Sequence, residues 1–587
     1  MTIHCSKYRL LSFSLRALLI LGLLGASVRS GDAAAPVPEG QGLKPILDYI
    51  SSGWDTLTRS MTECESIVDP KIAAPSVLYL PAGFTEPAAL QSLSGKCNVQ
   101  IDHLPVEIHR LGEFDSSHFN PPGLLYLPEK YVVPGGRFNE MYGWDSYFII
   151  RGLLESGRVE LARGMVDNFF FEVEHYGAML NANRTYYLTR SQPPFMSSMV
   201  VDVYAAMQKQ PSRKDAAAER EWLERAYVDL EKDYGMWTRD PHLAGQTGLS
   251  RYFDFGEGPP QEALQDEAGS NRKVAEYFFL HPQDADDYLV PIDPGTKQPV
   301  MKQSVAGPSY SLQICDVPLT MARPECNKTV PFKLSADYYK GDRSMRESGF
   351  DVSSRFGPFG AATHHYAPVC LNSLLYKMEK DLEQISQWLG HGDDARMWSK
   401  RADDRKKLIT KYLWNAQQGM FFDHDLKTNR MSDYRYATTF YPLWAGLATP
   451  EQAKAVAGNV KVFEKPGGLP MSTVETGAQW DLPYGWGNIE MIAIGGLRRY
   501  GYNADADRVS YEFLSMVAEN FRRDGNIREK YNVVTRSSEA HAEMGYHMNV
   551  IGFGWTNAAF LELLHALPKE MVERLEKEQS QPLAATN

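Results

Sequence analysis

Residues 371–389 read LNSLLYKMEKDLEQISQWL, and this stretch decides the fold class. Its apolar residues recur at the i, i+3, i+4, i+7 spacing, which predicts a helix with one apolar face. They are Leu371, Leu374, Leu375, Met378, Leu382, Ile385 and Leu389. Weaker versions of the pattern recur at 158–173, 216–233, 395–413, 451–460, 489–500, 504–521 and 556–566. Strand-like alternation is scarce and paired helices must bury their apolar faces on neighbours, so we predict an all-α solenoid or closed ring.

The composition is that of a folded globular protein. The chain has 587 residues, of which 43% are hydrophobic and 23% charged, and this much apolar material argues against intrinsic disorder. The net charge of −12 and the absence of a basic run argue against a nucleic-acid partner. Aromatic residues make up 12%, which suits the stacking of sugar rings and equally suits a large core.

The N-terminus has the pattern of a secretory signal peptide over residues 1–35. Lys7, Arg9 and Arg16 precede an apolar run, Ala17–Ala26, and small residues follow it. The run is shorter than the roughly 20 residues that a membrane span needs, although an uncleaved anchor is the alternative. We therefore expect a periplasmic or secreted protein without membrane contact after cleavage.

Five cysteines follow that segment, an odd number that leaves at least one free. Cys315 and Cys326 lie close together in a Pro-rich loop, and Cys64 with Cys97 is the second expected pair. Cys370 sits in an apolar run and is expected to be a buried free thiol. No CxxC motif occurs, so a zinc or redox site of that type has little support.

Several loops between the predicted helices combine aromatic rings with charged and amide side chains. They are PGGRFNEMYGWDSY (134–147), NANRTYYLTRSQPPF (181–195), RESGFDVSSRF (346–356), QWDLPYGW (479–486), REKY (528–531) and GFGWTN (552–557). Rings and hydrogen-bonding groups in this mixture suit a neutral polyol. Hydrolysis of a glycoside needs two carboxyl groups, and these loops supply several candidates. No G-x-S-x-G elbow, phosphate loop or HExxH motif is present, so other familiar chemistries lack their parts.

The motifs at 134–147 and 479–486 closely resemble the two signature motifs of the trehalases of glycoside hydrolase family 37. The other motifs follow in the order of that family, and the resemblance covers roughly residues 40–565. It implies an (α/α)6 toroid with long loop insertions. It also implies hydrolysis of α,α-trehalose to two glucose molecules with inversion at the anomeric carbon, without a cofactor or metal. The expected partners are the disaccharide and water, and we expect a monomer.

The resemblance also implies roles for individual residues. Asp351 matches the general acid and Glu529 the base that activates water. Residues matching sugar-contacting positions are Arg137, Trp144, Asp145, Asn181, Arg190, Gln192 and, by a loose alignment, Glu262. From their residue types and clusters, Arg355, Trp480 and Asp481 join the expected substrate-binding set.

Each assignment has a simpler alternative. Asp145 and Asp481 could cap loops, Arg137 could belong to a structural ion pair, and Glu543 is a rival for the base. His364-His365 has the look of a metal-binding pair, but the sequence offers no clustered third ligand, so no metal site is predicted.

The chain departs from the family pattern around the pocket. Gly487-Asn488 follows the second signature, and the stretch 537–550 lacks the glycines of the usual lid. Two alternatives therefore remain open: an inverting α-glucosidase acting on a related disaccharide, and a trehalose-binding protein without turnover.

The predicted domain organisation follows from these segments. A signal peptide covers 1–35, and an N-terminal extension packed on the toroid covers 36–120. The catalytic (α/α)6 domain covers 121–570 and contains a Pro-rich loop insertion at 256–345. A C-terminal tail covers 571–587.

Overall fold

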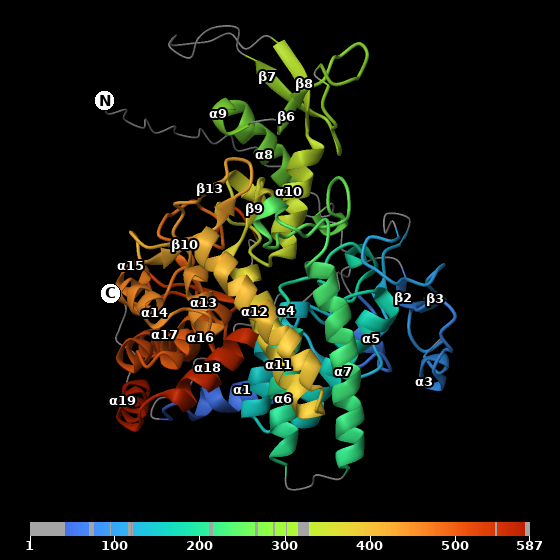
Figure 1. The fold of residues 1–587 in the computed structure, drawn as a ribbon. Helices are drawn as coiled ribbons and strands as arrows, with labels where there is room; N and C mark the ends of the chain where they lie inside the picture. Colours follow the sequence, from blue (N-terminus) through green and yellow to red (C-terminus); the bar gives the residue numbers. More distant parts are fainter. Residues whose placement is uncertain are drawn as a thin grey trace, which may run out of the picture.

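The computed structural model describes residues 41–581 except 70–74, 94, 115–118, 120, 211–214, 264–267, 286–287, 301, 315–327 and 546–548. Most of its regular structure is helical, as predicted (Figure 1). The predicted signal peptide and the Cys315–Cys326 pairing lie outside the described residues.

An inner ring of helices forms the core. Among the described helices, each member of the ring contacts the next, and α18 contacts α4 to close it. In ring order they are α4 (Gly143–Glu155), α6 (Met196–Gln208), α11 (Val369–Leu389), α13 (Tyr441–Trp444), α16 (Gly487–Arg499) and α18 (Gly554–Ala566). The stretch quoted above is α11, so the strongest helix prediction is confirmed.

Outer helices alternate along the chain with the inner ones. They are α5 (Val159–Tyr176), α7 (Ala216–Trp237), α12 (Gly392–Leu413), α14 (Pro450–Gly458) and α17 (Asn503–Asp524). The outer helices bury one face, whereas α4, α16 and α18 are buried almost all round, as expected for helices at the centre of a double layer. This alternation of inner and outer helices around a closed ring is the predicted (α/α)6 toroid.

The ring gathers the aromatic and polar loops at one place. Four of the six predicted clusters end at, or run into, the start of an inner helix: 134–147 leads into α4, 181–195 into α6, 479–486 into α16 and 552–557 into α18. The cluster at 346–356 leads through a short connection to α11. Because the inner helices stand side by side in a ring, the loops before them converge.

The N-terminal residues pack against the toroid. Helix α1 (Lys44–Thr56) contacts α18, and Trp54 of α1 is fully buried. A small parallel sheet follows, with β2 (Ser76–Leu80) between β3 (Val99–His103) and β4 (Leu124–Leu125). Cys64 and Cys97 form a disulfide in this part, which confirms that pairing, and Cys370 is free and buried as expected.

The stretch 256–345 contains more regular structure than its proline-rich sequence indicates. It holds α8 (Ala268–Leu280), α9 (Pro282–Ala285) and an antiparallel sheet in the order β6-β8-β7. The strands are β6 (Leu289–Pro291), β7 (Tyr310–Ile314) and β8 (Lys328–Leu334). Phe278, Tyr310 and Phe332 belong to its separate hydrophobic cluster, and the whole unit projects from the helical body (Figure 1). Prolines therefore mark the turns of a small α/β unit that leads into α10 (Ala336–Glu347).

The C-terminal residues add α19 (Lys569–Ser580), which packs on α17. Among the helices that the structure describes, none is both long and apolar enough to cross a membrane.

Candidate active site

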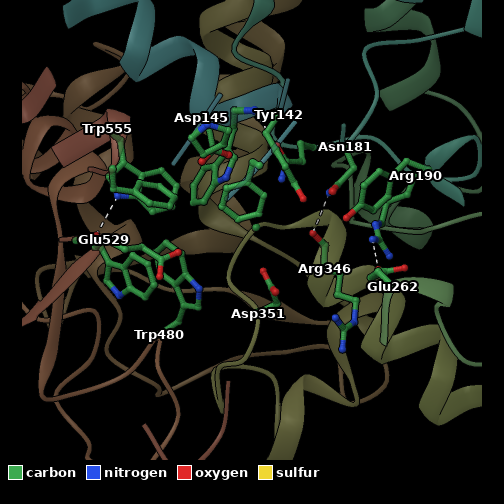
Figure 2. A pocket seen from close by; sticks show the side chains of 18 residues that line it. Tyr142, Asp145, Asn181, Arg190, Glu262, Arg346, Asp351, Trp480, Glu529 and Trp555 are labelled. Atoms are coloured by element: carbon green, nitrogen blue, oxygen red, sulfur yellow. Dashed lines mark hydrogen bonds and ion pairs between the residues drawn. The ribbon is translucent and has the colours of Figure 1, made fainter. Parts of the chain in front are cut away.

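The converging loops line one cleft (Figure 2). Its wall contains nine of the predicted site residues: Trp144, Asp145, Asn181, Arg190, Gln192, Glu262, Asp351, Trp480 and Glu529. These nine come from six separate stretches of the sequence, so the fold alone brings them together.

Asp351 reaches the cleft from the loop that follows α10. The side chain of Gln479 donates a hydrogen bond to the Asp351 carbonyl oxygen, and Trp480 N donates to Val352 O at 3.1 Å. Two consecutive carbonyl groups of this loop, those of Asp351 and Val352, are therefore bound by the 479–486 motif. Asp351 is half-buried, and its carboxyl group faces the open space of the cleft (Figure 2).

Glu529 reaches the same cleft from the end of a short strand pair. It directly precedes β15 (Lys530–Asn532), which pairs antiparallel with β14 (Tyr484–Trp486) so that Lys530 lies opposite Trp486. Trp555 Nε1 donates to the Glu529 carbonyl oxygen at 3.1 Å. The residue is only 4% exposed, so its carboxyl group is largely shielded from bulk solvent.

A buried cation accompanies Glu529. Lys530 Nζ lies 3.2 Å from Glu529 Oε2 and 3.1 Å from Gln479 Oε1, and its side chain is fully buried. It also lies 5.0 Å above the centre of the Trp486 ring. Gln479 thereby connects the backbone of Asp351 with the cation beside Glu529.

A third carboxyl group, that of Asp145, lines the same cleft and interacts electrostatically with Glu529 and Asp351. Asp145 is in the first turn of α4 and is 4% exposed. Burial raises its pKa well above the usual value, and repulsion from Glu529 and Asp351 raises it further. Three acidic groups therefore line one cleft, and burial with their mutual repulsion favours the protonated form of Asp145.

The opposite end of the cleft is polar. Arg190 is buried, pairs with Glu262 and lies 3.4 Å from Asp254 Oδ2. Burial raises the pKa of Glu262, but Arg190 and Arg346 outweigh it, and the net pKa is lower than usual. Glu262 is thus held as an acceptor of hydrogen bonds from hydroxyl groups.

Indole rings form the wall near Glu529. Trp480 stacks on Trp486 with ring centres 3.7 Å apart and planes 3° apart. The ring centres of Trp144 and Trp555 lie 5.7 and 6.2 Å from the ring centre of Trp480. Such flat apolar surfaces match the C–H faces of a pyranose and exclude water from the charged groups beside them.

Three predicted substrate contacts lie elsewhere. Arg355 is 3% exposed and forms a bidentate ion pair with Asp423, with 2.7 Å between Nε and Oδ2. Asp481 is fully buried and accepts hydrogen bonds from Ser354 N at 2.9 Å and Thr476 Oγ1 at 2.6 Å. Arg355 and Asp481 therefore make contacts within the protein behind the cleft wall. For Asp481 this agrees with the alternative that it caps a loop.

Arg137 is exposed, and its guanidinium carbon lies 4.7 Å from the centre of the Phe138 ring. Phe138 lines the cleft, whereas Arg137 is absent from the described lining. The rival base Glu543 is also exposed and is absent from that lining.

Some lining residues were not singled out in the sequence analysis. Tyr142 and Tyr187 belong to the quoted clusters but carry no charge, and Arg346 is the first residue of its cluster. Arg346 lies 3.3 Å from Asp342 Oδ1 through its Nε, and its carbonyl oxygen accepts from Asn181 Nδ2 at 3.4 Å. Their membership of dense aromatic and polar clusters was the available signal.

Comparison with known proteins agrees with this geometry. A family model described as trehalase matches residues 51–281 and 331–568, leaving out most of the projecting α/β unit. A probable trehalase of Eremothecium gossypii is 34% identical over 569 residues, which cover 86% of this chain and 70% of that protein. The cytosolic neutral trehalase of Saccharomyces cerevisiae is also 34% identical, over 86% of this chain and 69% of that protein.

A solved structure gives the same result. The neutral trehalase from Saccharomyces cerevisiae matches with a TM-score of 0.71 and 31% identity, covering 91% of this chain and 96% of that one. The likeness therefore extends over the ring and the loops that line the cleft.

The relatives contradict the prediction of export. Several are named cytosolic neutral trehalases, so the predicted signal peptide and the periplasmic or secreted location were wrong. A cationic start followed by a short apolar run is a pattern of composition, and it does not by itself fix the compartment of the domain behind it. The segment concerned lies outside the described residues.

Proposed function

Since this chain belongs to the trehalase family, we propose that it hydrolyses α,α-trehalose to two glucose molecules with Asp351 as general acid and Glu529 as general base. The observation that carries the proposal is that these two carboxyl groups, far apart in the sequence, line one shielded cleft. Hydrolysis of a glycoside requires such a pair.

The mechanism is a single displacement. Asp351 gives its proton to the bridging oxygen, so that the bond from this oxygen to one anomeric carbon breaks and the first glucose leaves. On the opposite face, Glu529 takes a proton from a water molecule whose oxygen bonds to the same anomeric carbon. The two carboxyl groups exchange protonation states, and the configuration at the attacked carbon is inverted.

The two ends of the cleft support a disaccharide as substrate. In Figure 2, Asp351 lies between the indole wall beside Glu529 and the polar end at Arg190 and Glu262. One ring stacks on the aromatic side while the hydroxyl groups of the other meet the charged side. The bridging oxygen then lies near Asp351, where a proton is needed.

The first experiment is a glucose-release assay on the purified chain with α,α-trehalose, run beside maltose and other α-linked disaccharides. Proton NMR of the first products gives the stereochemistry. Inversion yields one α- and one β-glucose per trehalose, because only the attacked carbon changes, whereas retention yields two α-glucose molecules. Preference for another disaccharide, or trehalose binding without glucose release, contradicts the proposal.

Asp351→Asn tests the general acid. We expect at least about a hundredfold loss of kcat with the melting temperature retained, because an amide cannot supply the proton. Turnover at the wild-type rate would remove Asp351 from this role.

The protein is proposed to act as a monomer. The proposed mechanism needs only Asp351, Glu529 and a water molecule, and both carboxyl groups line the same cleft, so turnover does not require a second copy. Light scattering on an active sample tests this, and a dimer in the active fraction contradicts it.

A further inference from the structure

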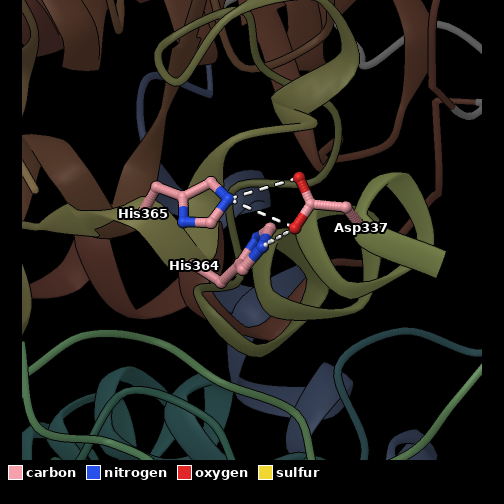
Figure 3. Close-up of side chains that lie close together, drawn as sticks. All are labelled: Asp337, His364 and His365. Atoms are coloured by element: carbon pink, nitrogen blue, oxygen red, sulfur yellow. Dashed lines mark hydrogen bonds and ion pairs between the residues drawn. The ribbon is translucent and has the colours of Figure 1, made fainter. Parts of the chain in front are cut away.

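Outside the cleft, two imidazoles and a carboxylate converge (Figure 3). His364 Nε2 lies 2.8 Å from Asp337 Oδ1, and His365 Nε2 lies 3.3 Å from both oxygens of the same carboxylate. One ligand-type atom from each of the three residues lies within 4.8 Å of the others. The sequence offers the histidine pair no clustered third ligand, and the fold supplies one.

The three residues come from two rigid elements. Asp337 lies in the first turn of α10, and the histidines form the end of a 3-10 turn, η6 (Thr363–His365). These elements contact one another directly. Asp337 precedes His364 by 27 residues, so no local spacing pattern reveals the cluster.

Both imidazoles are held close to the carboxylate. The side chain of His364 is 4% exposed and that of His365 is 19% exposed, and the centres of the two rings lie 3.7 Å apart. Lys427 Nζ, at 3.6 Å from Asp337 Oδ2, is the cation that would compete with a metal ion.

We propose that Asp337, His364 and His365 form a binding site for Zn²⁺, with water completing a tetrahedral set. Two nitrogen ligands and one carboxylate oxygen are donors that Zn²⁺ prefers. At metal–ligand distances of about 2.0–2.1 Å, neighbouring ligands of a tetrahedral ion lie about 3.3 Å apart. The observed separations of 2.8 and 3.3 Å are close to this, so small side-chain movements let the ion take the place of the hydrogen bonds that join the two imidazoles to Asp337.

The position of the site gives it a structural role. Asp337 lies before, and His364 and His365 after, the loop that carries Asp351. An ion bound by all three fixes both ends of that segment, as a metal clip closes a loop. The proposed hydrolysis does not use the ion, so the two proposals stand or fall separately.

The experiment uses the full-length protein, first treated with EDTA and then freed of it. We expect one equivalent of Zn²⁺ in calorimetry and a visible absorption band with Co²⁺ that Zn²⁺ displaces. The melting temperature should rise by about 2 °C at a Zn²⁺ concentration a hundredfold above Kd.

Variants locate the ion. Asp337→Asn and His365→Gln should each abolish the Co²⁺ band and weaken Zn²⁺ binding at least about tenfold, since loss of a direct ligand exceeds the 10- to 100-fold effects of outer partners. Lys427→Met should tighten Zn²⁺ binding about threefold, because it removes the competing charge. His565→Gln is the matched control: His565 also lies beside a carboxylate, with 2.7 Å to Glu155, but the described structure places no second imidazole there.

Three results would overturn the proposal. The first is that the treated wild-type protein binds no Zn²⁺. The second is that Asp337→Asn and His365→Gln bind it as tightly as the wild type. The third is that Asp351→Asn abolishes binding, which would place the ion among the carboxyl groups of the cleft. If Asp337→Asn or His365→Gln fails to fold, the tighter Zn²⁺ binding expected for Lys427→Met and the unchanged binding expected for Asp351→Asn still test the position of the ion.

Discussion

Replacing Lys530 with methionine removes the buried cation beside the proposed base. Lys530 Nζ lies 3.2 Å from Glu529 Oε2, and the side chains are 0% and 5% exposed. At that distance and an effective dielectric constant of 20, Coulomb's law gives an attraction of about 5 kcal/mol. Breaking a buried pair by removing one partner costs about 3–5 kcal/mol, because the remaining charge stays buried.

The assay is thermal unfolding at low ionic strength, combined with the rate of glucose release. For 587 residues the unfolding entropy is roughly 1.2 kcal/mol per kelvin, so Lys530→Met should lower the melting temperature by about 2–4 °C. Lys400→Met is the matched control, since Lys400 Nζ lies 2.6 Å from Asp404 Oδ2 with side chains 78% and 47% exposed. That exposed pair should contribute less than about 1 kcal/mol.

A double variant decides whether the two charges act as a pair. Lys530→Met with Glu529→Gln leaves no uncompensated charge, so its loss of stability should be smaller than the sum of the single losses by about 3 kcal/mol. Glucose release should fall in Lys530→Met as well, because Glu529 loses the group that orients it. Strictly additive losses, or a Lys530→Met variant as stable and active as Lys400→Met, would refute the reasoning.

Three further predictions follow from other contacts. Arg355→Met should lower the free energy of unfolding by about 3–5 kcal/mol by leaving Asp423 buried without its partner, while the KM of the remaining activity changes little; a raised KM without loss of stability would place Arg355 against substrate. Asp145→Asn should stabilise the protein more at pH 7 than at pH 4. The pKa of Asp145 is raised in the folded state, so wild-type stability falls as pH rises from the unfolded pKa of about 3.9 towards the folded pKa, and the uncharged asparagine removes this loss. Melting curves recorded across pH measure the difference. Gln479→Met should lower kcat about ten- to a hundredfold with KM nearly unchanged, because the loop of Asp351 loses its tie; steady-state kinetics checks this, and an unchanged kcat contradicts it.

Of the ring helices named above, the sequence predicts all five outer ones but only three of the six inner ones, α11, α16 and α18. Outer helices such as α12 and α17 meet solvent on one side, so their apolar residues recur with a helical period. Helix α4 is buried almost all round and starts inside the motif 134–147, so it shows no contrast between faces and was read as a loop. Helix α6 was also missed: residues 196–200 are all buried and the rest of the helix is buried or half-buried, so the contrast between its faces is weak.

The composition of the candidate site was more predictable than the direction of its side chains. Clusters of aromatic and polar residues mark the loops that reach the cleft, and nine of the twelve expected residues line it. Arg355 has the residue type of a sugar-binding group, but its partner Asp423 lies in a segment without a motif, so sequence alone could not reveal their pairing. The cluster of Asp337, His364 and His365 was missed for the same reason, because a contact between distant segments exists only after folding.

One shared side chain, that of Gln479, links the two proposed catalytic groups. Gln479 donates to the carbonyl oxygen of Asp351 and accepts from Lys530, which in turn donates to Glu529. The acid and the base are therefore linked through the buried side chains of Gln479 and Lys530. Inversion requires carboxyl groups about 6.5–9.5 Å apart, and retention requires about 5 Å. If Gln479 sets this separation, a shorter or apolar replacement should lower the rate of glucose release and leave the first products as one α- and one β-glucose. A change in the product anomers would mean that the pair itself has been misassigned.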